Sequence, residues 1–297
     1  MYITEGNHGM INKIYLEITN VCNLACSFCH GTKRPKKLLS EAEFETLTDA
    51  LTGHAKFLYF HLMGEPLLHP LFPAFVRRAW EKGFYPILTT NGSLLEKRGE
   101  ELLRNLPYKI SISLHAPAAN AAFADPAYFA SCIDFSKRAA TAGCIVVLRL
   151  WNIGGEGEEE NAAILDRLRE AFPDPWTPSH RDSMRLGTAR VFLEWGEHFD
   201  WPDPTAPAIG PDGELFCYGL RDQIGVLSDG TVVPCCLDAD GNLPLGNLFE
   251  ESLEAILSSD RARAIYDGFT ERRAAEDLCR RCGYARRFRK DKNKNAP

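Results

Sequence analysis

The regular alternation of short β-rich runs with helical patterns constrains the fold of this chain more than any other feature. Six runs rich in β-branched and aromatic residues occupy residues 14–19, 57–63, 85–90, 109–114, 145–151 and 189–195. Amphipathic patterns separate these runs, and one begins with the capping-box residues Ser40 and Glu43. This alternation predicts an α/β fold with a parallel sheet and right-handed crossovers. Periodicity leaves open whether the sheet is open or curls into a barrel, but in both cases ligands bind at the carboxyl ends of the strands.

Charge and hydropathy exclude several classes of protein. The 297 residues contain 34 Lys and Arg and 40 Asp and Glu, a net charge of −6, which argues against a general polyanion binder. The sequence has no run of 18 apolar residues and no signal-peptide pattern at its N-terminus. We therefore expect a cytoplasmic protein with no membrane partner.

The chain changes character after about residue 196. Residues 196–213 are rich in Pro, Gly and Asp, and are typical of a linker. Residues 224–233 then predict a β-hairpin that turns at Asp229 and Gly230, and helices are expected over 251–257 and from about Asp260. We therefore predict a first domain over residues 1–200 and a second over 201–297. The second is small enough to benefit from a bound metal.

Ten cysteines in a reducing compartment need a role other than disulfide formation. Cys132 and Cys144 stand alone and are predicted to be small buried side chains. The other eight form an N-terminal cluster and a C-terminal one, namely Cys22, Cys26 and Cys29, and Cys217, Cys235, Cys236, Cys279 and Cys282. Clustered thiolates select zinc or iron–sulfur centres.

The N-terminal cluster lies just after the first strand, with the spacing Cys-x3-Cys-x2-Cys. A structural zinc site needs four ligands, and the nearby His30 directly follows Cys29, where it is poorly placed to reach the same ion. Three thiolates on a four-iron cube would instead leave one iron open to a substrate. A zinc site remains the competing interpretation.

This motif, with Phe28 before its last cysteine, resembles the signature of the radical S-adenosylmethionine (SAM) superfamily. The ends of the next strands are similar to segments common in that family: Met63-Gly64-Glu65-Pro66 after the second, Thr89-Thr90-Asn91-Gly92 after the third and Ser111 to His115 after the fourth. Met63 departs from the family's first glycine but leaves Glu65 intact. The resemblance implies a partial (β/α)6 TIM-like barrel.

The resemblance also implies roles for individual residues. Cys22, Cys26 and Cys29 would hold a 4Fe–4S cluster whose open iron takes the amino and carboxylate groups of SAM. Gly64 and Glu65 would meet the methionine amino group of SAM, and Phe28 would contact the adenine. Asn91 and Ser113 would reach the ribose or the methionyl moiety, and Arg149 would pair with the carboxylate of SAM.

The C-terminal cysteines resemble the SPASM/Twitch extension of radical SAM enzymes. Four of them would bind a second, auxiliary 4Fe–4S cluster: Cys217, Cys235, Cys279 and Cys282. Their small number fits the shorter Twitch form, a hairpin with helices, and the spacing is similar to that of a radical SAM dehydrogenase of an amino-cyclitol alcohol. Adjacent residues of a strand point to opposite faces, so only one of Cys235 and Cys236 should be a ligand, and the pattern favours Cys235.

The resemblance implies that the enzyme cleaves SAM reductively to a 5′-deoxyadenosyl radical, which abstracts hydrogen from a small-molecule or peptide substrate. An oxidation assisted by the auxiliary cluster is expected, with flavodoxin or ferredoxin as reductant. Oxidation also needs a general base. Asp238 is the first candidate because it closely follows an auxiliary cysteine, and Glu194 and His115 rank below it.

Two other functions stay open at this stage. A peptide-modifying maturase of the same superfamily is the first, although the 21 residues before Cys22 are too few for the leader-binding domain that many maturases carry. A non-catalytic iron–sulfur or zinc module that binds nucleic acid is the second. It would use the basic run from Lys33 to Lys37 and the tail over 280–294, which holds eight basic residues. A solvated tail is the favoured interpretation of that segment.

Overall fold

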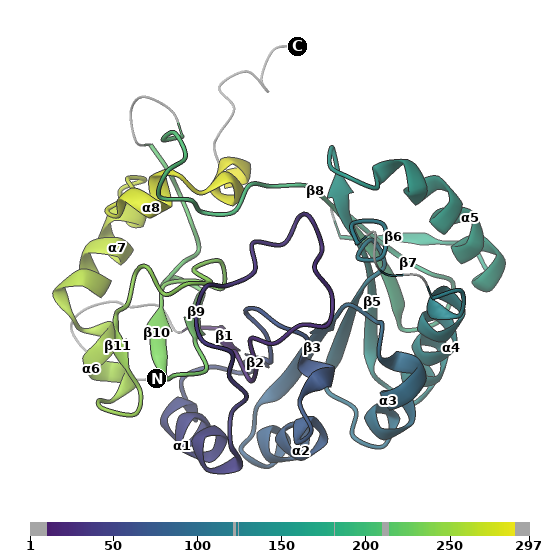
Figure 1. Cartoon of the computed structure of the whole chain (residues 1–297), viewed down its shortest axis with the longest axis horizontal. Helices are drawn as coiled ribbons and strands as arrows, with labels where there is room; N and C mark the ends of the chain where they lie inside the picture. The colour runs from purple at the N-terminus through teal and green to yellow at the C-terminus, as the bar shows by residue number, and fades with distance from the viewer. Residues whose placement is uncertain (1–10, 121–122, 124, 181, 210–213, 289–297) are drawn as a thin grey trace.

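The structure, a computed structural model, describes residues 11–120, 123, 125–180, 182–209 and 214–288. Its centre is a sheet that curves around an opening, with helices on the outside (Figure 1). Six strands run parallel and lie side by side in chain order. They are β1 (Lys13–Leu16), β2 (Phe57–Tyr59), β3 (Tyr85–Thr90), β4 (Lys109–Ser113), β5 (Ile145–Ile153) and β8 (Val191–Glu197). Each coincides with one of the six β-rich runs in the sequence.

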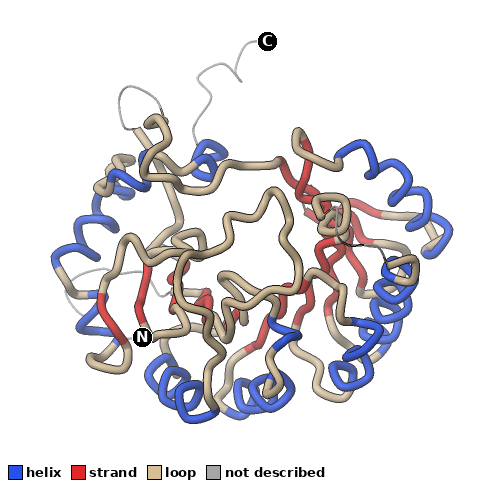
Figure 2. The backbone as a smooth tube through the Cα atoms, viewed as in Figure 1, coloured by secondary structure: helices blue, strands red, loops and turns tan. Residues whose placement is uncertain are grey.

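Helices connect the parallel strands and cover the convex face of the sheet (Figure 2). They are α1 (Glu41–Leu51), α2 (Phe72–Glu81), α3 (Leu95–Leu103), α4 (Tyr128–Thr141) and α5 (Asn161–Ala171), with short 3-10 turns η1 (Pro66–Leu68) and η2 (Glu158–Glu160). The predicted capping box begins α1, because the Glu43 amide donates to Ser40 Oγ and the Ser40 amide donates to the Glu43 carboxylate.

The main core lies between the sheet and these helices. Phe44 of α1 and Phe75 of α2 stack with ring centroids 4.0 Å apart. Both rings are fully buried in this core. Cys132 in α4 and Cys144 before β5 are also buried, as the sequence predicted for isolated thiols. This core fixes the strands and thereby the loops at their carboxyl ends.

Extra strands extend the sheet beyond both of its parallel edges. On one side a hairpin of β7 (Ser183–Arg185) and β6 (Thr177–His180) adds to β8. On the other side β9 (Gln223–Val226) pairs in parallel with β1, and β10 (Thr231–Val233) and β11 (Gly246–Asn247) follow in antiparallel order. The predicted hairpin is therefore a continuation of the central sheet.

The C-terminal segment adds helices beside this second edge. They are α6 (Leu253–Leu257), α7 (Asp260–Thr270), α8 (Asp277–Arg280) and the 3-10 segment η3 (Gly283–Phe288). The predicted helices at 251–257 and from Asp260 correspond to α6 and α7. The division of the chain at residue 200 remains a prediction. No helix in the described ranges is long and apolar enough to cross a bilayer.

Candidate functional site

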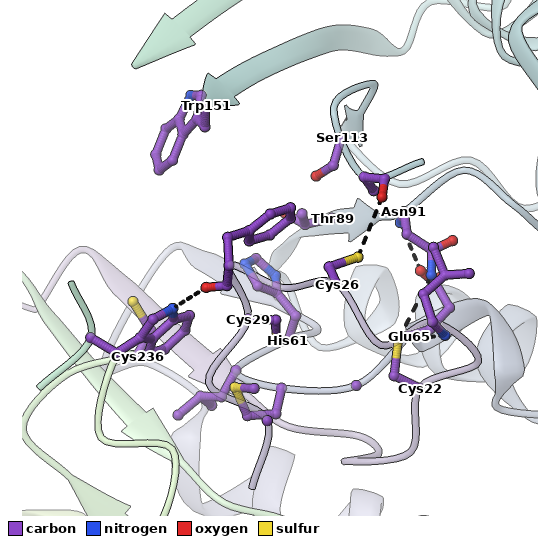
Figure 3. A pocket seen from close by; sticks show the side chains of 18 of the residues that line it. Cys22, Cys26, Cys29, His61, Glu65, Thr89, Asn91, Ser113, Trp151 and Cys236 are labelled. Carbon is purple, nitrogen blue, oxygen red and sulfur yellow. Dashed lines mark hydrogen bonds between the residues drawn. The ribbon is translucent and has the colours of Figure 1, made fainter. Parts of the chain in front are cut away.

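A cavity of about 590 Å³ opens at the carboxyl ends of the parallel strands. All three N-terminal cysteines and all six residues predicted to contact SAM line it: Cys22, Cys26, Cys29, Phe28, Gly64, Glu65, Asn91, Ser113 and Arg149. Figure 3 shows Cys22, Glu65 and Asn91 at one end of this cavity, and Trp151 and Cys236 at the other. The sequence motifs thus meet in one place because parallel strands present their carboxyl ends at the same edge.

A long loop between β1 and α1 carries the three thiols and extends across the inside of the curved sheet (Figure 1). Asn20 closes its base: the Asn20 side chain donates to Pro35 O at 2.8 Å and accepts from the Lys37 amide at 2.8 Å. Within the loop, the Cys29 amide donates to Cys26 O at 3.0 Å, forming a tight turn. Asn20 is buried, lines the cavity, and was not predicted from the sequence.

The three thiols are suited to bind a cluster whose iron ions stabilise the thiolate form. Burial raises the pKa of Cys26 to about 12, with Cys29 and Cys22 adding to the effect, so thiolates here need a cationic partner. One zinc ion would hold its sulfurs about 3.8 Å apart, given Zn–S bonds of about 2.3 Å. In the described ranges no group of three or more His, Cys, Asp or Glu side chains is placed to hold a single metal ion. Three thiols around one open cavity fit a cube that bonds each to a different iron.

The predicted fourth candidate, His30, points away from these thiols. Its Nε2 lies 3.1 Å from the Asp240 carboxylate, and its ring stacks on Trp201 with centroids 6.0 Å apart. The side chain is therefore engaged by the C-terminal part of the chain.

Glu65 holds the ends of neighbouring strands together. Its carboxylate accepts from the Leu67 amide at 3.0 Å, from Thr90 Oγ1 at 2.8 Å and from the Asn91 amide at 2.7 Å. Burial raises its pKa to about 7, although these hydrogen bonds oppose that shift. Glu65 therefore positions Thr90 and Asn91, and direct contact with SAM stays a prediction.

Gly64 is required by its surroundings. Its φ is +79°, and a Cβ there would lie 2.5 Å from Thr19 O and 2.9 Å from Val21 O, both backbone atoms at the base of the cysteine loop. Close backbone approach of this kind admits only glycine.

We expect Gly64→Ala to lower the free energy of unfolding by about 2 kcal/mol or more, because it combines an unfavourable φ with a backbone clash. Gly143→Ala is the matched control, since Gly143 also has a positive φ of +97° but no atom within 4 Å of its would-be Cβ. Urea denaturation measures both. Equal losses in the two variants would show that the clash with the loop is absent.

Asn91 and Ser113 lie near the thiols but have different surroundings. The Asn91 amide donates to Asn23 Oδ1 at 3.1 Å and approaches Cys22 Sγ at 3.8 Å, while its Oδ1 accepts from Ser93. Ser113 ends β4 with its side chain toward the cavity (Figure 3). Asn91 therefore contacts the cysteine loop itself, a role that the motif did not predict.

Phe28 forms a wall of the cavity with residues that the sequence did not single out as aromatic partners. Its ring lies 4.9 Å from that of His115, and its carbonyl accepts a hydrogen bond from Trp201 Nε1 at 3.0 Å. Burial lowers the pKa of His115 to about 4, so this ring is neutral at physiological pH. Trp201 belongs to the predicted linker, which therefore contributes directly to the site.

Arg149 lies at the end of the cavity that Trp151 and Cys236 mark. Its guanidinium carbon is 4.1 Å from the centroid of the Trp151 ring, and Nη2 is 3.6 Å from Glu194 Oε1. Glu194 also accepts from Trp151 Nε1 at 3.1 Å. These contacts fix the plane of the guanidinium.

The C-terminal cysteines divide between two pockets. A second, mostly apolar pocket is lined by the four predicted auxiliary ligands, Cys217, Cys235, Cys279 and Cys282. Cys236 lines the large cavity instead. Cys235 and Cys236 lie in the bend and turn that follow β10, beyond the strand in which an alternation of side chains was expected. Four thiols in one pocket match a closed iron–sulfur site.

Asp238, the predicted base, faces the second pocket and not the large cavity. It is 2% exposed, and its carboxylate accepts from the Asn242 amide at 2.8 Å, the Asn242 side chain at 3.2 Å and the Leu243 amide at 2.8 Å. The carboxylate thus closes the turn after Cys235. This placement favours a loop-holding role, and proton transfer by Asp238 remains a prediction.

The two cysteine loops are joined by buried polar contacts. Glu17 of the N-terminal part is fully buried, and Arg34 Nη2 donates to both of its carboxylate oxygens, at 2.7 and 2.6 Å. Arg34 Nε donates to Ala239 O at 2.9 Å, and Ser228 Oγ donates to Glu17 at 2.9 Å. This network fixes the loop after Cys29 against the loop after Cys236.

We expect Arg34→Met to lower the free energy of unfolding by about 3–5 kcal/mol, because it leaves the buried Glu17 carboxylate without its cation. Arg169→Met is the matched control: Arg169 pairs with Asp166 at 2.9 Å on an exposed face, where such a pair contributes about 0–1 kcal/mol. Guanidinium denaturation compares the two. A loss below 1 kcal/mol in Arg34→Met would mean that the network does not stabilise the fold.

Several side chains of the basic stretches considered for nucleic acid are paired with acids. Arg34 binds Glu17, Lys37 binds Glu43 at 2.7 Å, and Arg281 binds Asp277 at 2.8 Å. Residues 289–294 of the basic tail lie outside the described residues. The nucleic-acid alternative gains no support from the described part.

Comparison with known families agrees with this geometry. The family model for the radical SAM superfamily matches residues 16–171, just over half of the chain. The chain belongs to the radical SAM superfamily. A second family model, an iron–sulfur cluster-binding domain named SPASM, matches residues 217–283. The predicted family, the SAM cofactor and the 4Fe–4S clusters are thereby confirmed.

Known proteins also resemble this radical SAM enzyme over most of its length. A PqqA peptide cyclase from Streptomyces rochei is 26% identical over 90% of this chain and 80% of its own. The subtilosin biosynthesis protein AlbA from Bacillus subtilis (strain 168) is 24% identical over 90% of this chain and 65% of its own. The matched part of the chain spans between about a quarter and two thirds of the length of each of the first three curated relatives.

A solved structure confirms the fold class. BtrN in complex with AdoMet and 2-DOIA superposes with a TM-score of 0.62 at 21% identity, covering 93% of this chain and 94% of its own. At this identity the likeness establishes the fold alone, a partial TIM-like barrel with a small C-terminal cluster region.

Proposed function

We propose that this radical SAM enzyme oxidises its substrate with the help of an auxiliary cluster. One observation carries the proposal: Gln223, Leu237 and Tyr284 line both the large cavity and the four-thiol pocket. A substrate in the cavity would therefore be separated from the auxiliary site by single side chains. This proximity suits transfer of an electron from a substrate radical.

The proposed division of labour follows the placement of the residues. Cys22, Cys26 and Cys29 would hold one cluster, and the four thiols of the second pocket the other. When bound, the first cluster and SAM supply a 5′-deoxyadenosyl radical that abstracts hydrogen. The proposed SAM contacts are Phe28, Gly64, Glu65, Asn91, Ser113 and Arg149.

Oxidation by two electrons removes a hydrogen atom, an electron and a proton from the substrate. In such an oxidation the hydrogen atom would go to the deoxyadenosyl group, the electron to the auxiliary cluster held by the four thiols, and the proton to a base. Flavodoxin or ferredoxin remains the proposed reductant for SAM cleavage. Enclosure by Phe28, His115 and Trp201 would keep water from the reacting carbon.

Asp238→Asn tests the base. If Asp238 takes the proton, the variant should still form 5′-deoxyadenosine but lose most of the product, about 10²-fold or more. Because the carboxylate also holds the turn after Cys235, iron content must be counted in the same sample. Unchanged product yield with full iron would remove Asp238 from the mechanism.

A peptide-modifying enzyme is the second candidate. The similarity to a PqqA peptide cyclase over 90% of this chain favours it. The two candidates share the site and differ in substrate. Deuterated amino-cyclitol alcohols and deuterated peptides, offered separately, distinguish them through deuterium transfer into 5′-deoxyadenosine.

The deciding experiment for the shared function is anaerobic reconstitution followed by addition of dithionite and SAM. Formation of 5′-deoxyadenosine is expected, with roughly eight irons per chain for two cubane clusters. A reconstituted sample that holds its iron and cleaves no SAM would contradict the proposal and favour a non-catalytic module.

A further inference from the structure

The segment directly after Cys29, residues 30–33, is held by the C-terminal part of the chain. Three groups of this segment lie within hydrogen-bond distance of the Asp240 carboxylate, namely the Lys33 amide at 2.9 Å, Thr32 Oγ1 at 2.9 Å and His30 Nε2 at 3.1 Å. Among the described residues, the hydrogen bonds that reach this segment from outside its own loop come from Asp240 and from the carbonyl of Ala239. Asp240 is therefore the main polar anchor of the chain that leaves Cys29.

The other two thiols of the first cluster have their neighbours in the first half of the chain. Cys26 Sγ lies 3.5 Å from Ala116 O, and Cys22 Sγ lies 3.8 Å from Asn91 Nδ2. Both partners follow strands of the parallel sheet, β4 and β3 respectively. The position of the third thiol relative to these two consequently depends on a contact between parts of the chain about 210 residues apart.

Trp201 holds the other side of Cys29. Its Nε1 donates to Phe28 O at 3.0 Å, and its ring stacks on that of His30 with centroids 6.0 Å apart. The side chain of Asp240 is only 17% exposed, so its ionic contact is screened less by salt than a surface pair would be. Cys29 thus lies between two anchors that both belong to the C-terminal part of the chain.

The loop that carries Asp240 begins at the auxiliary cysteine Cys235. Asp238 fixes this loop, because its carboxylate accepts from the Asn242 amide and the Leu243 amide, both at 2.8 Å, and Asp238 itself lines the four-thiol pocket. Asp240 stands only two residues further on. A change in the order of the four-thiol site would therefore reach Asp240 through one short, hydrogen-bonded turn.

We propose that Asp240 is a positioning residue that couples the two cysteine sites. It sets the place of Cys29 from the loop after Cys235, so that SAM binds more tightly at the first cluster when the auxiliary site is loaded. Such a coupling between two sites through one contact has a measurable free energy. The inference rests on the two cluster assignments and goes beyond the proposed oxidation, because it concerns the binding of SAM before any reaction.

A double-mutant cycle on the anaerobically reconstituted enzyme tests the coupling. Isothermal titration calorimetry without reductant measures the dissociation constant of SAM for the unaltered enzyme, Asp240→Ala, Cys235→Ser and the double variant. We expect each single variant to weaken SAM binding at least about fivefold, and the double variant to bind SAM within about twofold of either single variant. Unchanged affinity in either single variant, or losses that multiply in the double variant, would overturn the inference.

Asp222→Ala is the matched control. Asp222 also joins the C-terminal part of the chain to the N-terminal part, because its carboxylate accepts from Lys13 Nζ and Asn12 Nδ2, both at 2.7 Å. This contact lies at the amino end of β1, whereas the cysteine loop follows the carboxyl end of that strand. The variant should leave SAM affinity within about twofold. A loss as large as that in Asp240→Ala would show that SAM affinity follows general stability, and would overturn the proposed role of Asp240.

Two further measurements separate positioning from a merely structural role. Asp240→Asn should keep SAM affinity within about twofold, because an amide of the same shape can accept from Lys33 and Thr32 and donate to a neutral His30. In steady-state assays Asp240→Ala should raise the KM for SAM at least about fivefold and leave the kcat for 5′-deoxyadenosine within about twofold. A loss of kcat with an unchanged KM would overturn the inference.

If Asp240→Ala does not fold, His30→Phe takes its place. A phenyl ring can keep the stacking on Trp201 and removes the contact with Asp240, so SAM binding should weaken about threefold, and unchanged binding would overturn the inference. The outcome is separable from that of the proposed function. The expected cycle of SAM affinities without any oxidised product would leave the coupling standing and remove the oxidation, and oxidised product with unchanged affinities would do the opposite.

Discussion

Replacing Cys26 by serine should abolish SAM cleavage by this enzyme. The serine hydroxyl is a poor ligand for iron at neutral pH. The nearby His30 offers no substitute ligand, because its ring is turned toward Asp240. We expect 5′-deoxyadenosine formation to fall by at least about 10³-fold and iron to fall from roughly eight to roughly four per chain. Anaerobic reconstitution, iron and sulfide analysis, and chromatography of the nucleoside products measure both quantities.

Cys132→Ala is the control for the loss of a thiol. Cys132 is fully buried in α4, within the main core, and lines neither cysteine pocket. The variant should lose some stability through a small cavity and keep all its iron. Full iron and full SAM cleavage in Cys26→Ser would show that this thiol is not a ligand, and the assignment of the first cluster would fail with it.

The sequence was sufficient to bring together most of the residues that line the large cavity beside the cysteine loop. Its motifs follow buried parallel strands, and such strands end at a common edge, so Glu65, Asn91 and Ser113 had to lie near the cysteine loop. The sequence also predicted features that depend on only a few consecutive residues. The capping box at Ser40 and the hairpin turn at Gly230, with a φ of +86°, are examples.

Long-range pairing left no local signal in the sequence. The parallel pairing of β9 with β1 joins residues more than 200 positions apart, and all four residues of β6 are exposed, with Pro178 among them. For the same reason Trp201 read as part of a linker, although it donates to Phe28 O across the site.

Buried hydrogen bonding explains the residues whose roles changed. Its closeness in sequence to Cys235 placed Asp238 near the auxiliary cysteines, which is where it lies, but nothing in the sequence indicated that both carboxylate oxygens are used by the following turn. His61 and Trp151 carry no motif at all. Their place beside the large cavity arises from ring contacts that exist only in the folded chain.

The second large effect is expected at the adjacent thiols Cys235 and Cys236, because replacing the first should remove a cluster and replacing the second should not. Cys235 shares its pocket with Cys217, Cys279 and Cys282, whereas Cys236 faces the large cavity. We expect Cys235→Ser to lower iron from roughly eight to roughly four per chain while SAM cleavage persists, and product formation to fall at least about 10²-fold. Iron analysis and product assays on both serine variants measure this.

Cys236→Ser is the matched control, one residue away in the same turn after β10. It should retain both clusters, since its sulfur lines a different cavity from that of the four ligands. The reverse result, with iron lost from Cys236→Ser and kept in Cys235→Ser, would show that Cys236 and not Cys235 is the ligand. In that case the auxiliary cluster would lie on the side of the large cavity, and Gln223, Leu237 and Tyr284 would no longer separate it from the substrate.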